Sequence, residues 1–237
     1  MQALYTKLAG LYHQMYQSIF DDDTEFRNAH RLLKPYSPKS VLEVGCGAGN
    51  LATRFSAAGY EYTGMDVAKP MLRIAARENP LATFLQGDMR RFTVKRKFDA
   101  IIVRGRSFTY MTRNEDVLSA LHCFRKALRP RGVLVFDNFD AESIFTDLAR
   151  PLRDMVRVGD KTISRLSKRT PNLRTGWTWN WDATYVVKEG PKVRTFLDRS
   201  VLRAFTPDEL ALFLRISGFT RIQLQRQQSV IEAVAQV

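Results

Sequence analysis

The chain has 237 residues, of which 45% are hydrophobic, so it can bury a sizeable core and wholesale disorder is excluded. Lysine and arginine outnumber aspartate and glutamate by 37 to 24, and the net charge of +13 suits an anionic partner or a well-solvated surface. No apolar run reaches the roughly 20 residues that cross a bilayer. The N-terminus lacks the apolar core of a signal peptide, and the two cysteines, Cys46 and Cys123, give neither a disulfide framework nor metal-ligand spacing. We therefore expect a cytoplasmic protein with no metal site and no membrane partner.

Two helices are expected at the N-terminus, over residues 2–19 and 22–34. The second begins with the acids Asp21, Asp22 and Asp23, which complement the positive end of a helix dipole, and it ends before Pro35. Polar residues interrupt the apolar pattern of the first helix, so it reads as amphipathic.

Strands and helices then alternate. Strands are expected at residues 41–44, 60–66, 82–86, 98–103 and 132–137, and helices at 51–58, 70–78 and 114–128. The segments AIIV and VLVF are continuous apolar runs, which is typical of parallel strands covered on both faces. This pattern predicts a doubly wound α/β sheet whose ligands bind at the carboxyl ends of the strands.

After Asp140 the periodicity changes. WTWNWDATYVV alternates with period two and predicts a half-buried antiparallel strand, with partners at 162–167 and 193–205. We favour a sheet core for Trp177, Trp179 and Trp181 over an aromatic cage. A helix capped by Thr206 and a final antiparallel pair at 220–225 and 229–237 complete the chain. We expect one domain made of 1–140 and 205–237, with a small antiparallel β insertion at 141–204 that covers substrate or contacts another subunit.

The segment VLEVGCGAGN places three glycines after the first strand. A dinucleotide fingerprint needs a third glycine where Asn50 stands, so the turn favours another cofactor. Glu43 precedes the glycines, Asp66 ends the second strand, and Asp88 ends the third. A carboxylate after the second strand suits paired ribose hydroxyls, and one followed by an apolar side chain, here Met89, suits an adenine.

These residues together resemble the class I S-adenosylmethionine-dependent methyltransferases, through E-x-G-C-G-x-G, GMDVAKPML and GDM. The resemblance implies a seven-stranded sheet with its last strand antiparallel and S-adenosylmethionine over the glycine turn. Glu43 would organise the ammonium group, Asp66 the ribose, and Asp88 with Met89 the adenine; Ala68 replaces the serine or threonine of many relatives. The implied cofactor-binding residues are Glu43, Gly45, Cys46, Gly47, Gly49, Asp66, Val67, Met71, Asp88, Met89 and Arg104.

Two further segments resemble the glycine N-methyltransferases and the amino-sugar N,N-dimethyltransferases. RGRSFTYM is similar to G-N-S-F-x-H-L, and ALYTKLAGLYHQMY is similar to a tyrosine-bearing helix that covers the site, so residues 1–36 are expected to form a helical lid. Arg106 replaces an asparagine and His13 an aspartate, which argues against glycine as the substrate. The implied substrate-binding residues are Tyr5, Tyr16, Ser107, Tyr110, Asp137 and Asn138, and the candidate catalytic residues are His13, Tyr12 and Arg106.

The activity implied is in-line methyl transfer to a small molecule, with nitrogen favoured over oxygen. A neutral amine needs little base assistance, whereas a hydroxyl needs a base within about 2.6–3.2 Å, and His13 is the only histidine expected near the pocket. Either Arg104 or Arg106 could clamp a carboxylate or phosphate of an anionic acceptor, or both could face solvent or pair with acids.

Two alternatives stay open. An RNA methyltransferase could use the eight basic residues at 148–174 to contact phosphates, although the segment after the fourth strand does not match enzymes that methylate base amino groups. A protein that binds S-adenosylmethionine without catalysis is the other. Nucleic acid is thus a possible but not favoured partner, and a homodimer is also possible.

Overall fold

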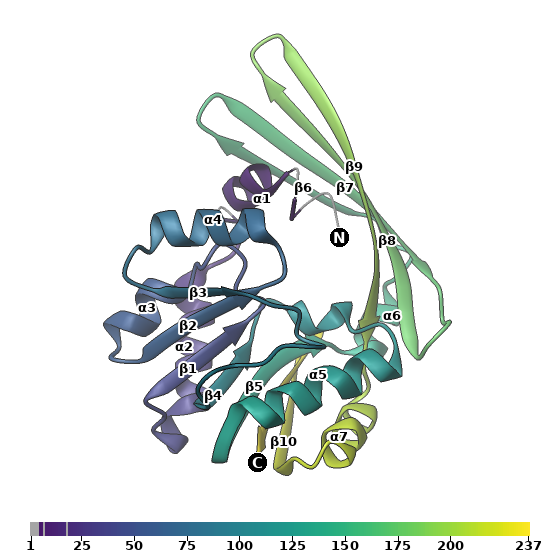
Figure 1. Ribbon diagram of the computed structural model, residues 1–237. Coiled ribbons are helices and arrows are strands. Elements are labelled where there is room, and N and C mark those ends of the chain that lie inside the picture. Colours follow the sequence, from purple (N-terminus) through teal and green to yellow (C-terminus); the bar gives the residue numbers. More distant parts are fainter. Residues whose placement is uncertain (1–4, 7, 18) are drawn as a thin grey trace.

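The computed structural model describes residues 5–6, 8–17 and 19–237 and contains two β-sheets (Figure 1). The larger sheet has seven strands in the order β10-β11-β5-β4-β1-β2-β3, and the smaller has four in the order β6-β7-β8-β9. In the larger sheet β11 runs antiparallel to both of its neighbours, and the pairs among β1 to β5 are parallel. The expected doubly wound sheet of seven strands is confirmed.

The strands of the larger sheet follow the apolar runs of the sequence. All five residues of β1 are buried, because helices cover both faces of a parallel sheet. β5 begins before residue 132, where the expected strand began, because the chain extends as soon as the preceding helix ends. The strands are β1 (Ser40–Val44), β2 (Glu61–Asp66), β3 (Thr83–Gln86), β4 (Phe98–Val103), β5 (Leu128–Phe139), β10 (Thr220–Gln227) and β11 (Val230–Gln236).

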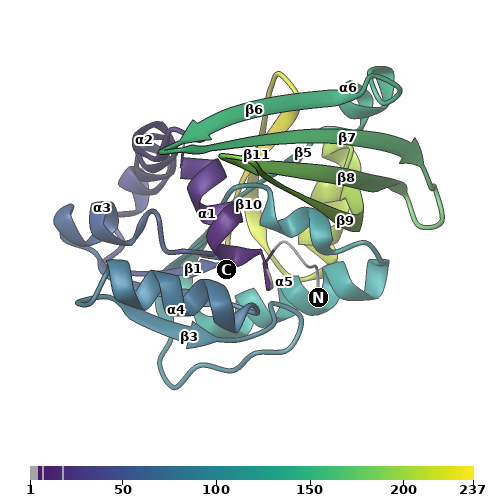
Figure 2. The ribbon, with the colours of Figure 1, turned by 90° about the horizontal axis from the view of Figure 1, so that it is seen from above.

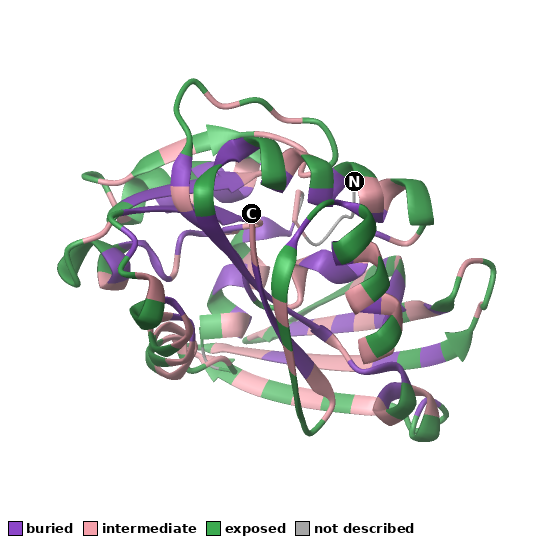
Figure 3. Ribbon diagram, turned by 90° about the horizontal axis from the view of Figure 1, so that it is seen from below, coloured by how far each residue is buried: buried purple, intermediate pink, exposed green. Residues whose placement is uncertain are grey.

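Helices pack on the two faces of this sheet and make two apolar cores. Phe124 of α5 and Leu214 of α7 pack with Phe136 on one face, and Leu33 of α2 and Phe55 of α3 pack on the other. Figure 3 shows these buried strands passing between helices whose outer sides are exposed. The helical segments are α2 (Asp22–Leu33), η1 (Lys34–Tyr36), α3 (Ala52–Ala57), α4 (Lys69–Glu78), η2 (Ser107–Tyr110), α5 (Asn114–Ala127) and α7 (Pro207–Ile216).

The N-terminal helix α1 spans Ala9–Gln17 and lies between α4 and the smaller sheet (Figures 1 and 2). The expected helix over 2–19 is therefore shorter here; residues 1–4, 7 and 18 lie outside the described residues. Met15 is fully buried against Tyr185 and Val187 of the smaller sheet. On its other side α1 packs Ala9 against Ala48 and Met71, so the helix bridges the two sheets.

Between β5 and α7 the chain forms the smaller sheet, which is antiparallel throughout. The alternation of WTWNWDATYVV is confirmed from Trp179 onward, where Trp179 is fully buried in a core with Ile144 and Trp181 packs against it. At the start of the strand Trp177 is 39% exposed and Thr178 is buried, so the core expectation was wrong for Trp177. One helix and one strand of this region were missed. The helix has only six residues, too few to show a period, and charged residues interrupt the apolar residues of the strand. The elements are α6 (Ala141–Thr146), β6 (Leu152–Val158), β7 (Lys161–Pro171), β8 (Trp177–Glu189) and β9 (Lys192–Ala204). A domain division at 141 and 204 stays a prediction.

Candidate active site

The glycine turn connects β1 to α3 and is held against the end of β2. The amides of Gly45 and Cys46 donate to the carbonyl of Met65 at 2.7 and 3.0 Å. The Asp66 carboxylate accepts from the Gly47 amide at 2.9 Å and from the Ala68 amide at 2.7 Å. Each carboxylate oxygen can still accept a second hydrogen bond, so Asp66 both shapes the turn and can bind paired hydroxyls.

The three glycines of the turn are not all required for the same physical reason. All three have positive φ, at +78°, +54° and +74° for Gly45, Gly47 and Gly49. A Cβ on Gly45 would lie 2.8 Å from Ser107, and one on Gly49 would lie 2.9 Å from Phe84, so the protein's own packing excludes side chains at both. A Cβ on Gly47 would meet only Met71, at an ordinary 3.5 Å. Gly47 therefore leaves an open approach to the backbone, which fits a bound nucleoside.

Glu43 is buried on β1 and accepts a hydrogen bond of 2.5 Å from the hydroxyl of Tyr62 on β2. Burial raises the pKa of Glu43 to about 7, against the opposing influence of the Tyr62 hydrogen bond and the charge of Arg104. A buried carboxyl without a full counter-ion can stabilise an incoming ammonium group, which is the role expected from the sequence.

Among the other expected cofactor residues, Cys46 lies on the protein side of the turn. A Cβ on Gly64 would come within 2.9 Å of the Cys46 sulfur, and burial raises the pKa of this thiol, so its side chain packs as a small apolar group. Asp88 is already bound by Arg90, whose hydrogen bonds lower the pKa of the Asp88 carboxyl. Met71 is buried beside the turn, Met89 packs on the core of the α5 face, and Val67 is exposed.

Four tyrosines from α1, its preceding segment and η2 form one cluster above the turn. The Tyr5 and Tyr110 hydroxyls are 2.8 Å apart, the Tyr5 and Tyr12 rings meet edge to face, and Tyr12 stacks on Tyr16 at 4.1 Å between centroids. Burial raises the pKa of both Tyr5 and Tyr12, and the charge of Asp66 further raises that of Tyr12. The phenols of Tyr5 and Tyr12 are therefore neutral at physiological pH, and the charge of Asp66 reaches Tyr12.

His13 does not join this cluster. Its Nε2 lies 3.0 Å from the carboxylate of Glu78 at the last residue of α4, and its Nδ1 has no hydrogen-bond partner among the described residues. Glu78 is seven residues beyond Met71, which is about 10 Å along a helix at 1.5 Å per residue. The structure thus places His13 as a link between α1 and the far end of α4.

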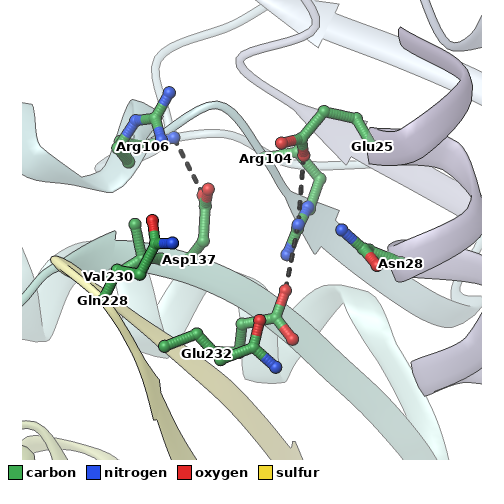
Figure 4. Close-up of a pocket in the computed structure, with 9 residues that line it drawn as sticks. Glu25, Asn28, Arg104, Arg106, Asp137, Gln228, Val230 and Glu232 are labelled. Atoms are coloured by element: carbon green, nitrogen blue, oxygen red, sulfur yellow. Dashed lines mark hydrogen bonds and ion pairs between the residues drawn. The ribbon is translucent and has the colours of Figure 1, made fainter. Parts of the chain in front are cut away.

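The segment after β4 holds the remaining expected residues. Arg104 and Arg106 line a pocket of about 320 Å³ between α2, β5 and the β10–β11 hairpin, which we call the α2–β11 pocket (Figure 4). Asp137 of β5 lines it too and accepts from the Arg106 amide at 2.8 Å. Ser107 donates to the Arg104 carbonyl at 2.9 Å. Asn138 alternates to the opposite face of β5, where its Nδ2 is buried without a partner among the described residues.

The pocket also contains residues that sequence reasoning missed. Arg104 Nη2 lies 3.0 Å from Glu25 of α2 and 3.1 Å from Glu232 of β11. Glu232 is a lone acid in the apolar segment VIEAVAQ, and a charge inside an apolar strand is the signal that would have found it. Glu25 reads as an ordinary acid in the first turn of a helix, so nothing in the sequence singles it out.

The smaller sheet contributes one more polar cluster against α1. Arg165 of β7 donates hydrogen bonds to the Asp154 carboxylate and to the Tyr16 hydroxyl. Its guanidinium carbon lies 5.5 Å from the centre of the Trp181 ring. This arginine belongs to the basic stretch 148–174, yet its side chain is only 10% exposed. Tyr16, which was expected to bind substrate, is thus tied to the smaller sheet.

Comparison with known proteins identifies the family. A family model described as a methyltransferase domain matches residues 41–132. A dTDP-3-amino-3,4,6-trideoxy-alpha-D-glucopyranose N,N-dimethyltransferase of Streptomyces venezuelae is 30% identical over 180 residues, which are 76% of this chain and 74% of the relative. The crystal structure of Streptomyces venezuelae DesVI has a TM-score of 0.82 at 25% identity, covering 94% of this chain and 97% of that one. CalS10 of Micromonospora echinaspora, an amino pentose methyltransferase solved with S-adenosylmethionine bound, has a TM-score of 0.80 at 20% identity and covers 96% and 97%.

The chain belongs to the class I S-adenosylmethionine-dependent methyltransferases. It is an enzyme that methylates a small molecule with S-adenosylmethionine as the donor, and its relatives favour nitrogen over oxygen as the acceptor atom. The resemblance to the amino-sugar N,N-dimethyltransferase group is confirmed, and a binding protein without catalysis is set aside. Among the described residues, no helix is long and apolar enough to span a membrane.

Proposed function

We propose that the enzyme transfers a methyl group from S-adenosylmethionine to the amino group of an amino sugar in the cytoplasm. The observation that carries this proposal is the tyrosine cluster, in which the hydroxyls of Tyr5 and Tyr110 meet at 2.8 Å above the glycine turn. One relative, 30% identical to this chain, is named as an amino-sugar N,N-dimethyltransferase, which supports an amino sugar as the substrate class. The similar fold of DesVI, from the same organism as that relative, is consistent with this choice.

The residues present fit the donor. In this proposal the Asp66 carboxylate binds ribose hydroxyls, and the open side of Gly47 lets the nucleoside approach the backbone. Asp88 and Met89 stay the proposed adenine partners, with Arg90 already covering one side of the Asp88 carboxylate. When bound, S-adenosylmethionine supplies an activated methyl group on a positively charged sulfur.

The chain's own groups mainly position the acceptor and exclude water. A neutral phenol oxygen accepts a hydrogen bond from an amine N–H, which leaves the nitrogen lone pair free to attack. Such oxygens come from Tyr12 of α1, from Tyr5 in the segment before it, and from Tyr110 of η2. Burial raises the pKa of Tyr5 and of Tyr12 and so keeps both phenols protonated. Because the phenols of Tyr5 and Tyr12 hold their protons, they are poor general bases for a hydroxyl acceptor, which favours N-methylation.

The basic stretch 148–174 supports a small-molecule acceptor over nucleic acid. Arg165 and Arg169 turn inward, with side chains 10% and 6% exposed, and they pair with Asp154 and Asp147. Two of the eight cations are thereby withdrawn from any phosphate-binding surface. A salt-dependent affinity for a short RNA, retained in the presence of acceptor, would reverse this choice.

We also propose that the enzyme is a homodimer joined through the outer face of the smaller sheet. Four apolar side chains point from that face, at 75%, 58%, 62% and 40% exposure for Met155, Val193, Leu197 and Val201. Exposed apolar side chains gathered on one face mark association surfaces. Light scattering of the wild type and Leu197→Glu tests this, since a monomer in both cases contradicts it.

Turnover with matched acceptors tests the function. Purified enzyme and S-adenosylmethionine are incubated with a nucleotide-linked amino sugar and with the same compound carrying hydroxyl in place of amine. We expect N-methylated product, identified by mass spectrometry, from the amine only. Methylation of the hydroxyl compound, or S-adenosylhomocysteine formation that does not depend on either acceptor, contradicts the proposal.

A further inference from the structure

The α2–β11 pocket contains two arginines with different surroundings. Arg104 directly follows the last residue of β4, Arg106 comes two residues later, and both line the pocket (Figure 4). The sequence left open which of them binds an anionic part of the acceptor. Their ion pairs, stacking contacts and backbone conformations distinguish them.

Arg104 is held by the protein through Nη2, while its Nε and Nη1 have no hydrogen-bond partner among the described residues. Its side chain is 5% exposed and lies between Glu25 and Glu232, at 3.0 and 3.1 Å. Arg31 approaches Glu232 from the other side at 3.5 Å. The charge of Arg104 therefore balances two carboxylates: that of Glu25, whose side chain is 26% exposed, and that of the buried Glu232, which Arg31 also reaches.

Arg106 is available. Among the described residues it has no side-chain ion pair or hydrogen bond, and its guanidinium carbon lies 5.4 Å from the ring centres of both Phe20 and Phe139. Rings near a guanidinium cover its faces and hold its orientation, whereas its N–H groups point outward in the plane. Such an edge matches a carboxylate or phosphate, which accepts two parallel hydrogen bonds.

The backbone holds Arg106 in place at a conformational cost. Its φ is +60°, a left-handed conformation that costs a side-chain-bearing residue about 1–2 kcal/mol. The amide of Arg106 donates to Asp137 at 2.8 Å, which fixes this conformation. Strained backbone of this kind clusters at ligand-binding positions.

The carboxyl of Asp137 does not prevent an anion from binding in the pocket. Burial raises its pKa, while the charges of Arg104 and Arg106 lower it, and one oxygen is already used by the Arg106 amide. Glu25 and Glu232 share only Nη2 of Arg104, whose Nε and Nη1 are buried without a partner among the described residues. Arg106 differs in that its whole guanidinium is unpaired among the described residues and the residue is partly exposed at the pocket.

We propose that Arg106 binds an anionic group of the methyl acceptor, a phosphate or a carboxylate, at the α2–β11 pocket, and that Arg104, held between Glu25 and Glu232, organises the pocket. This inference rests on the proposed function, because the ligand is its acceptor. A phosphate of a nucleotide-linked sugar and a carboxylate of an amino acid share the chemistry that Arg106 recognises.

Anion binding separates the two sources and does not require turnover. Inorganic pyrophosphate and acetate are each titrated into the wild type, Arg106→Gln and Arg106→Lys by calorimetry at constant ionic strength. The control Arg113→Gln removes an equal charge from an exposed arginine paired with Glu115. We expect pyrophosphate or acetate to bind the wild type, and the one that binds more tightly identifies the anionic group as a phosphate or a carboxylate. Its affinity should fall about tenfold or more in Arg106→Gln. Arg106→Lys should recover only part, because an ammonium has no planar fork.

S-Adenosylhomocysteine affinity is measured in the same variants and should stay within about twofold of wild type. Phe139→Leu, which removes one covering ring but no charge, should weaken the anion by a few-fold. The inference is overturned if neither probe binds the wild type, if Arg106→Gln binds as well as Arg113→Gln, or if cofactor affinity falls as much as anion affinity. Failure of amine turnover with intact, Arg106-dependent anion binding would instead contradict the proposed acceptor alone.

Discussion

The phenol oxygen of Tyr5 lies 2.8 Å from the phenol oxygen of Tyr110, although 105 residues separate them in the chain. One comes from the segment before α1 and the other from η2, directly after β4. The contact therefore joins the N-terminal cover to the strand end where the acceptor is proposed to meet the donor. Both hydroxyls are partly buried, so this contact replaces hydrogen bonds to water.

Tyr110→Phe should lower kcat about tenfold while changing the free energy of unfolding by about 1 kcal/mol, the net worth of one hydrogen bond. The phenol oxygen positions the acceptor nitrogen, so its loss acts on the methyl-transfer step. Tyr60→Phe is the control, since it removes a hydroxyl bonded to His30 at 2.9 Å, away from the glycine turn. Equal kcat in the two variants, measured by S-adenosylhomocysteine release, would contradict a positioning role.

Asp66→Asn should weaken S-adenosylhomocysteine binding by about 10-fold to 100-fold, because hydrogen bonds to a charged acceptor contribute about 1.5–3 kcal/mol. Asparagine keeps an acceptor for the Ala68 amide at 2.7 Å but loses the acceptor for the Gly47 amide at 2.9 Å, so part of the lost affinity comes from the changed turn. Glu61→Gln, at the opposite end of β2 and paired with Arg96, should bind normally. Calorimetry decides, and near-normal affinity for Asp66→Asn would remove Asp66 from the ribose site.

Local sequence patterns predicted most of the fold. The run that predicted a strand at 98–103 gives β4 with the same bounds, and the cap expected at Thr206 accepts from the Glu209 amide at 3.2 Å. Periodicity and capping act over a few residues, so a single sequence contains them. For the same reason local sequence patterns suffice to place the glycine turn and Asp66 at one edge of the sheet.

Long-range contacts could not be placed in this way. Arg104 meets Glu25 and Glu232, which are 79 and 128 positions away, and no local pattern links the three. The partner of His13 was equally hidden, because Glu78 reads as an ordinary last residue of a helix. β6 was missed since its arginines read as a solvated charge run, although Arg165 on the paired strand β7 turns inward.

Gly45→Ala should destabilise the fold by about 1–3 kcal/mol, because its Cβ would lie 2.8 Å from Ser107 and its φ is +78°. Gly47→Ala lacks that clash and should cost only about 1 kcal/mol, but it should weaken cofactor binding more than Gly45→Ala does. Adding Ser107→Gly should restore part of the stability of Gly45→Ala and none of that of Gly47→Ala. Urea unfolding of the wild type and of these four variants measures the changes, and the absence of rescue in Gly45→Ala would refute the steric reason.

His13→Ala should speed S-adenosylhomocysteine release by about twofold to tenfold, because the hydrogen bond between His13 and Glu78 contributes about 0.5–1.5 kcal/mol. The Nε2 of His13 holds α1 to Glu78 at 3.0 Å, and α1 in turn carries the tyrosines that cover the turn. Glu78→Gln should have a similar effect, and the double variant should be no faster than either single one. Stopped-flow dissociation with additive effects would show that the two side chains act independently.

Glu43 should make stability fall as pH rises. Burial raises its pKa to about 7 in the folded protein, well above the value of about 4.3 for an exposed glutamate. Between those two values the folded state retains a proton that the unfolded state has lost, so raising the pH through this window favours unfolding. The difference amounts to about 4 kcal/mol, a stabilising contribution fully present below pH ~4 and lost by about pH 7. Glu43→Gln keeps an acceptor for the Tyr62 hydroxyl and does not titrate, so its unfolding free energy should change less with pH across this window than that of the wild type. Parallel pH profiles for the two proteins, measured by denaturant unfolding, would show that Glu43 is ionised in the folded state and that a nearby cation balances its charge.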